Sequence, residues 1–285
     1  MGAGTRVALV LGGGGVSGIA WLVGVMAGLT RRGLRIPPSC RVVGTSAGSV
    51  VGAELAHGVS PEVLYERQFG PTDERFREYS QRDADAKNQL LMTRVGGNLQ
   101  AARRRIGAFA LRSVTPDLQT RRAIIQARLT HSHWPDTPLD LCAMDAGTAA
   151  TVVLNRASDI SLVDAVMASC AVPGVWPVVP FGDMQLMDGG LRSMTNADLA
   201  LESEYVLVLA PLGDSAGNPV SGHLRRELED LRGAGVVVQA IVPDERSVEA
   251  IGDNVLDPAR RGRSAQAGLE QGLQIGPSLA PVWRR

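Results

Sequence analysis

The chain has 285 residues, of which 45% are hydrophobic and 20% charged, so it can bury a sizeable core. Its 29 basic and 29 acidic residues balance to a formal net charge of zero, and we expect no nucleic-acid partner because no global field attracts one. The three cysteines, without C-x-x-C spacing, predict neither a disulfide framework nor a zinc site. We expect no metal and no cofactor.

An uncharged stretch, residues 7–30, has the length of a membrane span. Glycines occupy all of positions 12–15 and recur three times further on, and such a density opposes one continuous helix. We therefore expect a buried strand at 6–11 (RVALVL), a glycine loop and a buried helix at 18–29. This interpretation makes the protein soluble and cytoplasmic.

The next motif is "GTSAGS", with Ser46 between two glycines. A short strand at 41–44 precedes it and a helix is predicted at 47–57, so Ser46 lies at a strand-to-helix turn. This is the context of a nucleophile elbow, here formed by Gly44, Thr45, Ala47 and Gly48 around the serine. Taken alone, the motif is equally compatible with an ordinary tight turn.

Residues 60–135 carry many charges at helix-like spacing, and we expect them to form a helical region that covers the substrate site. Within it, residues 101–112 (AARRRIGAFALR) mix an arginine cluster with large apolar residues. This pattern fits transient contact with an anionic membrane surface. A solvated helix face beside a stripe of core residues explains it equally simply, and we favour that interpretation.

Strands return at 139–144 and 151–154, and Ser161-x-x-Asp164 resembles a capping box that opens a helix. A short strand at 184–187 ends in Asp188, Gly189 and Gly190. Two further buried strands and a charged helix follow, at 205–210, 236–242 and 224–231. The alternation predicts an α/β fold with a mostly parallel sheet and helices on both faces. We expect a single domain over 1–285, with its motif-bearing core at 6–210 and a surface helix and loose tail at 255–285.

The glycine loop "LGGGGVSG" satisfies G-x-G-x-x-G after a strand and before a helix. A dinucleotide site also needs an acidic residue about twenty positions later, whereas the first acidic residue of the chain is Glu54. No Gly-Lys-Ser/Thr follows, which opposes a phosphate-binding P-loop. An oxyanion hole, or a purely structural turn, remains, because consecutive glycines leave backbone N–H groups accessible.

The partner of Ser46 is the next question. Of the four histidines, only His223 follows the candidate acids, as the order of an α/β-hydrolase triad requires. His57 lies about three helical turns from Ser46. Asp188 ends a strand before two glycines, so the chain can turn sharply and leave its carboxylate beside a crevice, where it can act as a general base. A plain turn explains "DGG" alone.

Four motifs, "GGGGVSG", "GTSAGS", "ASCAVPGVWP" and "MDGG", occur in this order, and together they resemble the patatin-like phospholipase family. The resemblance implies a three-layer α/β/α sandwich and metal-free acyl-ester hydrolysis by a Ser–Asp dyad. Carried over by position, Ser46 is the nucleophile and Asp188 the base. The likeness assigns the oxyanion donors to the N–H groups of Gly13, Gly14 and Gly15.

One position departs from the family pattern, because Ser17 stands where the family usually has Arg or Lys. This departure is compatible with catalysis, but it removes a cation that could bind the phosphate of a phospholipid headgroup. The leading hypothesis is a serine-dependent hydrolase of lipid or other carboxylic esters. An acyltransferase would use the same acyl-enzyme with another acceptor, and a catalytically silent binding protein is the third hypothesis.

Overall fold

A computed structural model describes residues 6–72, 74–214, 217–221 and 223–284. At its centre is an eight-stranded sheet with the order β5-β6-β3-β2-β1-β7-β8, and β4 pairs with β3 beside that path. The strands are β1 (Val7–Leu11), β2 (Arg41–Thr45), β3 (Leu139–Asp145), β4 (Thr151–Leu154), β5 (Val179–Phe181), β6 (Met184–Asp188), β7 (Tyr205–Leu209) and β8 (Val237–Ile241). The five strands from β3 to β8 along that order are parallel, whereas β4, β5 and β6 form antiparallel pairs.

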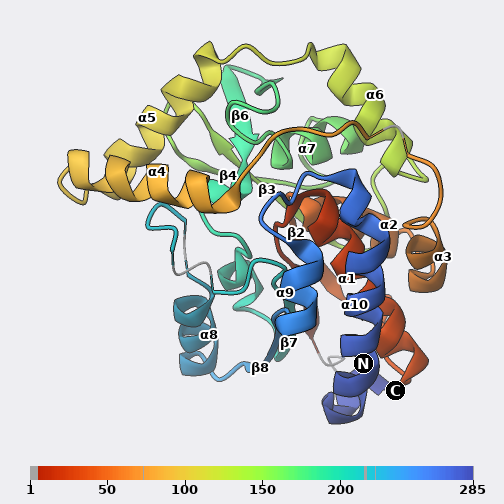
Figure 1. The fold of residues 1–285 in the computed structure, drawn as a ribbon. Coiled ribbons are helices and arrows are strands. Elements are labelled where there is room, and N and C mark those ends of the chain that lie inside the picture. Colours follow the sequence, from red (N-terminus) through yellow and green to blue (C-terminus); the bar gives the residue numbers. More distant parts are fainter. Residues whose placement is uncertain (1–5, 73, 215–216, 222, 285) are drawn as a thin grey trace.

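Helices lie on both faces of this sheet (Figure 1). They are α1 (Gly15–Arg31), α2 (Ala47–Ala56), α3 (Pro61–Glu66), α4 (Gln81–Arg94), α5 (Leu99–Arg112), α6 (Leu118–Arg128), α7 (Leu162–Ser169), α8 (Leu224–Gly233), α9 (Glu245–Ile251) and α10 (Arg261–Ile275). Short 3₁₀ turns add Gly189–Leu191, Ala197–Ala200, Pro258–Arg260, Gly276–Ser278 and Pro281–Arg284. The predicted α/β fold with a mostly parallel sheet and helices on both faces is confirmed.

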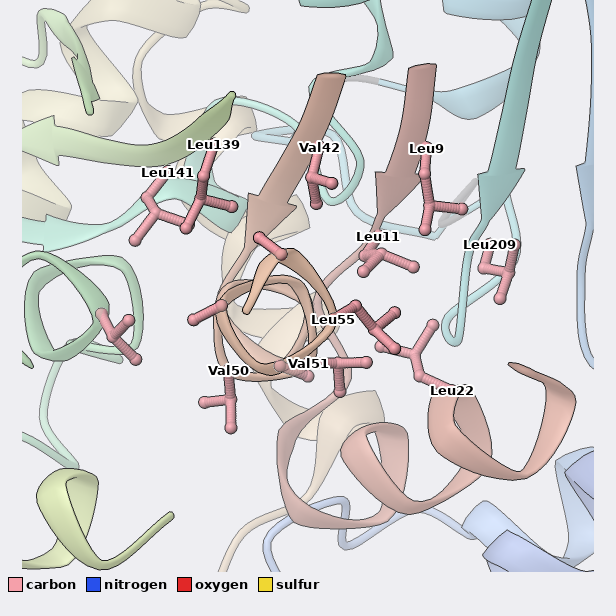
Figure 2. Close-up of a cluster of buried hydrophobic side chains, with 14 of the residues drawn as sticks. Leu9, Leu11, Leu22, Val42, Val50, Val51, Leu55, Leu139, Leu141 and Leu209 are labelled. Atoms are coloured by element: carbon pink, nitrogen blue, oxygen red, sulfur yellow. The ribbon is translucent and has the colours of Figure 1, made fainter. Parts of the chain in front are cut away.

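Alternate residues of β1 face two separate hydrophobic cores, because successive side chains of a strand point to opposite faces. Leu9 and Leu11 point toward α1 and α2, as Figure 2 shows. Ala8 and Val10 lie in the core on the other face, with the leucines of α8. Since both faces are buried, β1 appears in the sequence as a continuous apolar run.

Residues 60–135 form the helices α3 to α6, as their spacing predicts. In Figure 1, α4, α5 and α6 arch along one side of the molecule, where α5 contacts β6 and α6 contacts α7. The arginine-rich segment 101–112 lies in α5, which buries Ala102, Gly107 and Ala110. The remaining side of α5 is half-buried or exposed, in agreement with the favoured interpretation of a solvated face beside core residues.

The C-terminal segment contains a helix, as expected at 255–285, but its tail is not loose. Helix α10 packs so closely on α1 that a Cβ atom added at Gly24 would lie 2.1 Å from the carbonyl oxygen of Ala265. Trp283, almost at the end of the chain, is 1% exposed. The expected helix is present as α10, but the tail is packed. Glycines four residues apart, in α1 and again in α10, let the two helix backbones meet, and this contact buries one side of α10.

Candidate active site

Ser46 occupies a sharp turn between β2 and α2 and has a φ of 50°, a conformation rare for a residue with a side chain. The flanking glycines are a steric requirement of this turn. A Cβ atom at Gly44 would lie 2.7 Å from the carbonyl oxygen of Gly48, and one at Gly48 would lie 1.8 Å from the carbonyl oxygen of Leu11. The strand-to-helix turn predicted for "GTSAGS" is therefore present, and its strain presents the Ser46 side chain at the end of β2.

Asp188 ends β6, which pairs with β3 so that Asp188 lies opposite Ala143. The Ser46 hydroxyl donates a hydrogen bond of 2.8 Å to Oδ2 of Asp188, and both residues are buried. Oδ1 of the same carboxylate accepts a 2.8 Å hydrogen bond from the N–H of Gly190. A Cβ atom at Gly189 would lie 2.3 Å from the carbonyl oxygen of Cys142, so the first glycine of "DGG" permits this close passage.

The carboxylate of Asp188 has an unusual affinity for its proton. Burial raises its pKa to about 6, while the hydrogen bonds from Gly190 and Ser46 and the positive charge of Arg121 act in the opposite direction. A carboxylate with this pKa is mostly ionised at neutral pH. It is also basic enough to accept a proton, which suits a general base.

The glycine loop follows β1 and faces Ser46. The N–H of Gly13 donates to the carbonyl oxygen of Met194 at 2.8 Å, which corrects the expectation that it is a free oxyanion donor. Within the described ranges, the N–H groups of Gly14 and Gly15 donate no hydrogen bond, and neither does that of Ala47 at the start of α2. Three N–H groups thus remain available to bind an oxyanion. One of them belongs to Ala47, which was predicted only as part of the nucleophile elbow.

Ser17, the departure from the family pattern, is fully buried. Its N–H and its hydroxyl both donate to the carbonyl oxygen of Val255, at 3.1 Å and 3.3 Å. The side chain therefore fastens the start of α1 to the segment before α10. It supplies no charge to the glycine loop.

Three residues around Ser46 were not predicted as part of the site. The Ser46 N–H donates to the hydroxyl of Ser169 at 2.9 Å, and the Ser46 carbonyl oxygen accepts from Ser49 at 2.6 Å and from the Cys170 thiol at 3.2 Å. Ser169 and Cys170 belong to the motif "ASCAVPGVWP", so this motif is the sequence feature that could have identified them as part of the site. Together these bonds hold the strained backbone of Ser46.

Ser46 and Asp188 open onto a cavity of about 850 Å³. The glycine loop lines it, and so do residues of α4 and α5, the segment 172–175 and Met194. Large apolar side chains in this wall include Tyr79, Leu91, Ile106, Phe109, Val175, Leu191 and Leu212. These side chains suit a long apolar group, while charged residues that include Lys87 and Arg105 line other parts of the wall.

No histidine lies at hydrogen-bond distance from Ser46 within the part of the chain that the structure describes. His223 precedes α8 and lines neither of the two cavities that reach Ser46. His57 directly follows α2, about 16 Å from Ser46 by helix rise. Its ligand atoms and those of His131 and His133 lie within 4.8 Å of one another. The sequence did not predict this grouping, which takes no part in the site.

A buried serine bonded to a carboxylate, on an α/β sheet and facing a glycine loop, is the arrangement of a serine hydrolase. The sequence model of the patatin-like phospholipase family matches residues 9–201, more than half of the chain, and the chain therefore belongs to this family. The family consists of serine esterases and phospholipases, so this protein is an enzyme of that kind. No helix of the described residues is long and apolar enough to cross a membrane.

Two solved structures are similar to this chain at low sequence identity. VipD from Legionella pneumophila is 11% identical, covering 96% of this chain and 67% of its own, with a TM-score of 0.44. ExoU in its complex with SpcU, from the type III secretion system of Pseudomonas aeruginosa, is 21% identical over 95% of this chain and 52% of its own, with a TM-score of 0.36. The chain thus spans about half the length of that ExoU chain. No curated protein sequence matches it.

Proposed function

We propose that this protein hydrolyses carboxylic esters of lipids, with Ser46 as nucleophile and Asp188 as general base. The observation that carries the proposal is the 2.8 Å hydrogen bond from the Ser46 hydroxyl to Oδ2 of Asp188. As Oγ attacks the ester carbonyl carbon, the carboxylate takes the hydroxyl proton. No histidine is needed for this step.

The tetrahedral intermediate carries a negative charge on the former carbonyl oxygen. The N–H groups of Gly14, Gly15 and Ala47 are the donors proposed for it, because they form no other hydrogen bond among the described residues. Gly15 and Ala47 also begin α1 and α2, whose N-terminal ends favour a negative charge. Removal of one such donor typically lowers kcat by about 10²–10³.

The intermediate collapses when Asp188 passes its proton to the leaving alcohol, which leaves the acyl group on Ser46. Asp188 is then ionised again and takes a proton from a water molecule that attacks the acyl-enzyme. When this second intermediate collapses, the proton returns to Ser46 Oγ and the acid is released. Asp188 thus acts as base in each attack and as acid in each collapse.

The apolar wall of the 850 Å³ cavity supports an acyl chain as the group held beside Ser46. Brief contact with a membrane would deliver such a substrate. Phe109 and Val114, at the end of α5 and just after it, are 54% and 99% exposed beside the arginines of that helix. Membrane contact, like the cytoplasmic location, remains a prediction.

The test measures hydrolysis of a short p-nitrophenyl ester by the wild type and by S46A, with S39A as a control at an exposed serine. We expect S46A to lose turnover and labelling by a fluorophosphonate probe, whereas S39A keeps both. Turnover retained by S46A would refute the proposal. Transfer of the acyl group to an added alcohol in preference to water would identify an acyltransferase. A wild type that the probe does not label would identify a binding protein.

A further inference from the structure

A second, narrower cavity reaches Ser46 from the side of α6. Four arginines line it together with Ser46 and Ala47, and they are Arg75, Arg77, Arg121 and Arg128. Glu74, the acidic residue in this wall, forms a salt bridge with Arg128. The other three guanidinium groups form no salt bridge with any described residue. The cavity wall therefore carries excess positive charge next to the Ser46 side chain.

Arg121 is the most unusual of these residues. It lies in α6 and is 1% exposed, and its Nε and Nη1 atoms meet no hydrogen-bond acceptor in the described part of the chain. The buried Nε atom of Arg77 is also without an acceptor there. Both guanidinium groups lie over the ring of Trp176, with Cζ at 3.7 Å from the ring centroid for Arg121 and 4.1 Å for Arg77. The ring attracts the two cations but offers no acceptor to these N–H groups.

An ionised side chain that is buried without a hydrogen-bonded partner is costly to the fold. Burial lowers the pKa of the Arg121 guanidinium to about 9, and the charge of Arg128 contributes further, yet the group remains charged at neutral pH. Packing alone would be served as well by an apolar side chain of similar length. The unused N–H groups of Arg121 thus indicate an acceptor that is not part of this chain.

The charge of Arg121 acts on the titratable groups next to Ser46. The positive charge of Arg121 lowers the pKa of Asp188 and that of Cys170, although burial outweighs it in both cases. Ser46 itself lines both the arginine cavity and the 850 Å³ cavity with its large apolar side chains. A substrate bound at Ser46 can therefore extend an apolar chain into one cavity and an anionic group into the other.

We propose that Arg121 and Arg77 bind an anionic group of the substrate or product, either a phosphoryl group or a carboxylate, beside Ser46. This inference rests on the proposed function and adds the chemistry of the group recognised. The glycine loop has no cation of its own, since Ser17 is neutral and faces Val255. The positive charge next to the nucleophile comes instead from α6 and from the segment before α4.

The size of the arginine cavity limits how the anion is held. Its free volume is about 20 Å³, enough for about one water-sized group. One anionic oxygen therefore enters between the guanidinium groups and accepts from their unused N–H groups. The rest of the anion stays at the mouth, where Arg75 is exposed.

The first experiment measures binding without catalysis. The melting temperature is followed during titration with inorganic phosphate or with hexanoate, for wild type, R121M and R122M. Arg122 is the matched control because it lies next in α6 but pairs with Asp164 and does not line the cavity. We expect R121M to weaken binding of the anion about 10–100-fold, the value of lost hydrogen bonds to a charged group, and R122M to bind like wild type. Binding of phosphate alone identifies a phosphoryl group, and binding of hexanoate alone identifies a carboxylate.

The second experiment compares two substrates that differ only in a phosphate group, a lysophosphatidic acid and the monoacylglycerol with the same acyl chain. If phosphate is the anion bound, R121M lowers kcat/KM for the phosphate-bearing ester about 10–100-fold more than for the neutral ester. R121K recovers part of this preference because it restores the charge without the planar donors of arginine. Should R121M fail to fold, R77M and R121K take its place in both experiments.

The inference is overturned if neither anion stabilises the wild type, or if the arginine variants bind the anion as the wild type does. The two proposals fail separately. If the protein binds an anion through Arg121 but hydrolyses no ester, the anion site is supported and the proposed function is refuted. If it hydrolyses an ester through Ser46 but binds no anion through Arg121, the proposed function is supported and the anion site is refuted.

Discussion

The Ser46 hydroxyl lies 2.8 Å from the Asp188 carboxylate, although the two residues are 142 positions apart in the chain. The sheet makes this contact, because β2 and β6 both pair with β3 and end close together. Further hydrogen bonds hold both partners, since the Ser46 N–H donates to Ser169 and the Asp188 carboxylate accepts from the N–H of Gly190. The pair is therefore already arranged for proton transfer before substrate arrives.

Replacement of Asp188 by asparagine should remove the base and leave the shape of the site intact. We expect D188N to lower kcat for a neutral short ester by about 10²–10⁴, the usual contribution of a general base. D183N is the control, because Asp183 is exposed in the turn between β5 and β6. D188N activity within a few-fold of wild type would mean that another group takes the proton.

The pH dependence of kcat/KM should follow the ionisation of Asp188. The base acts only when ionised, and its pKa is raised to about 6 by burial. Activity should therefore fall about tenfold for each pH unit below 6 and level off above it. The measurement is kcat/KM for a neutral ester between pH 4.5 and 8, and a profile that stays flat down to pH 4.5 would contradict the raised pKa.

The same pKa predicts a pH-dependent stability. The unfolded carboxyl has its ordinary pKa of 3.8 and the folded one about 6, so the folded state binds the proton more tightly. This stabilising contribution is full below pH 3.8 and is lost as the pH rises through 6, with a total of about 3 kcal/mol. In urea unfolding, the free energy of unfolding of D188N should rise relative to that of the wild type between pH 4.5 and 7. D183N should follow the wild type, and a constant difference for D188N would argue against this assignment.

Steric limits at the elbow make Gly48 hard to replace. An added Cβ atom would lie 1.8 Å from the carbonyl oxygen of Leu11, and we expect G48A to lower the free energy of unfolding by about 1–3 kcal/mol or more. Gly233, in α8, has nothing within 4 Å of its added Cβ atom. G233A should therefore be neutral or slightly stabilising. Equal chemical denaturation midpoints for the two variants would contradict the close passage of β1.

Local patterns in the sequence predict the strands, the elbow and the turn after Asp188, because glycine spacing and apolar runs report on backbone shape. The pairing of Ser46 with Asp188 was predicted from the family resemblance and from the position of both residues at strand ends. The bond from Gly13 to Met194 and the stacking of Arg121 on Trp176 were not predicted. Both depend on side chains and carbonyl groups distant in sequence, whose directions no local pattern records.

The burial of the C-terminal helix was missed for a related reason. Its sequence has weak apolar periodicity, but Gly268 and Gly272 let its backbone approach that of α1. The close contact between the two helix backbones takes the place of the apolar stripe by which a buried helix is usually recognised in a sequence. The signal lay in the matching four-residue spacing of glycines in two segments far apart in the chain.

Substitution of Ser169 by alanine tests whether the strained backbone of Ser46 depends on the hydrogen bond from its N–H. Its hydroxyl accepts the Ser46 N–H at 2.9 Å in a fully buried position. In S169A this N–H has no acceptor, which should cost about 1–3 kcal/mol of stability. A looser Ser46 should also lower kcat about tenfold with little change in KM, because reaction geometry suffers more than binding.

Ser158 provides the matched control for S169A, since its hydroxyl accepts the N–H of Asn155 at 3.1 Å in a partly buried loop. S158A removes the same kind of bond at a position that lines neither cavity at Ser46. We expect S158A to keep wild-type kcat and to lose less stability than S169A, because solvent can replace the lost acceptor. If S169A loses stability but keeps full kcat, the bond supports the fold alone, and the Ser46–Asp188 contact is held without it.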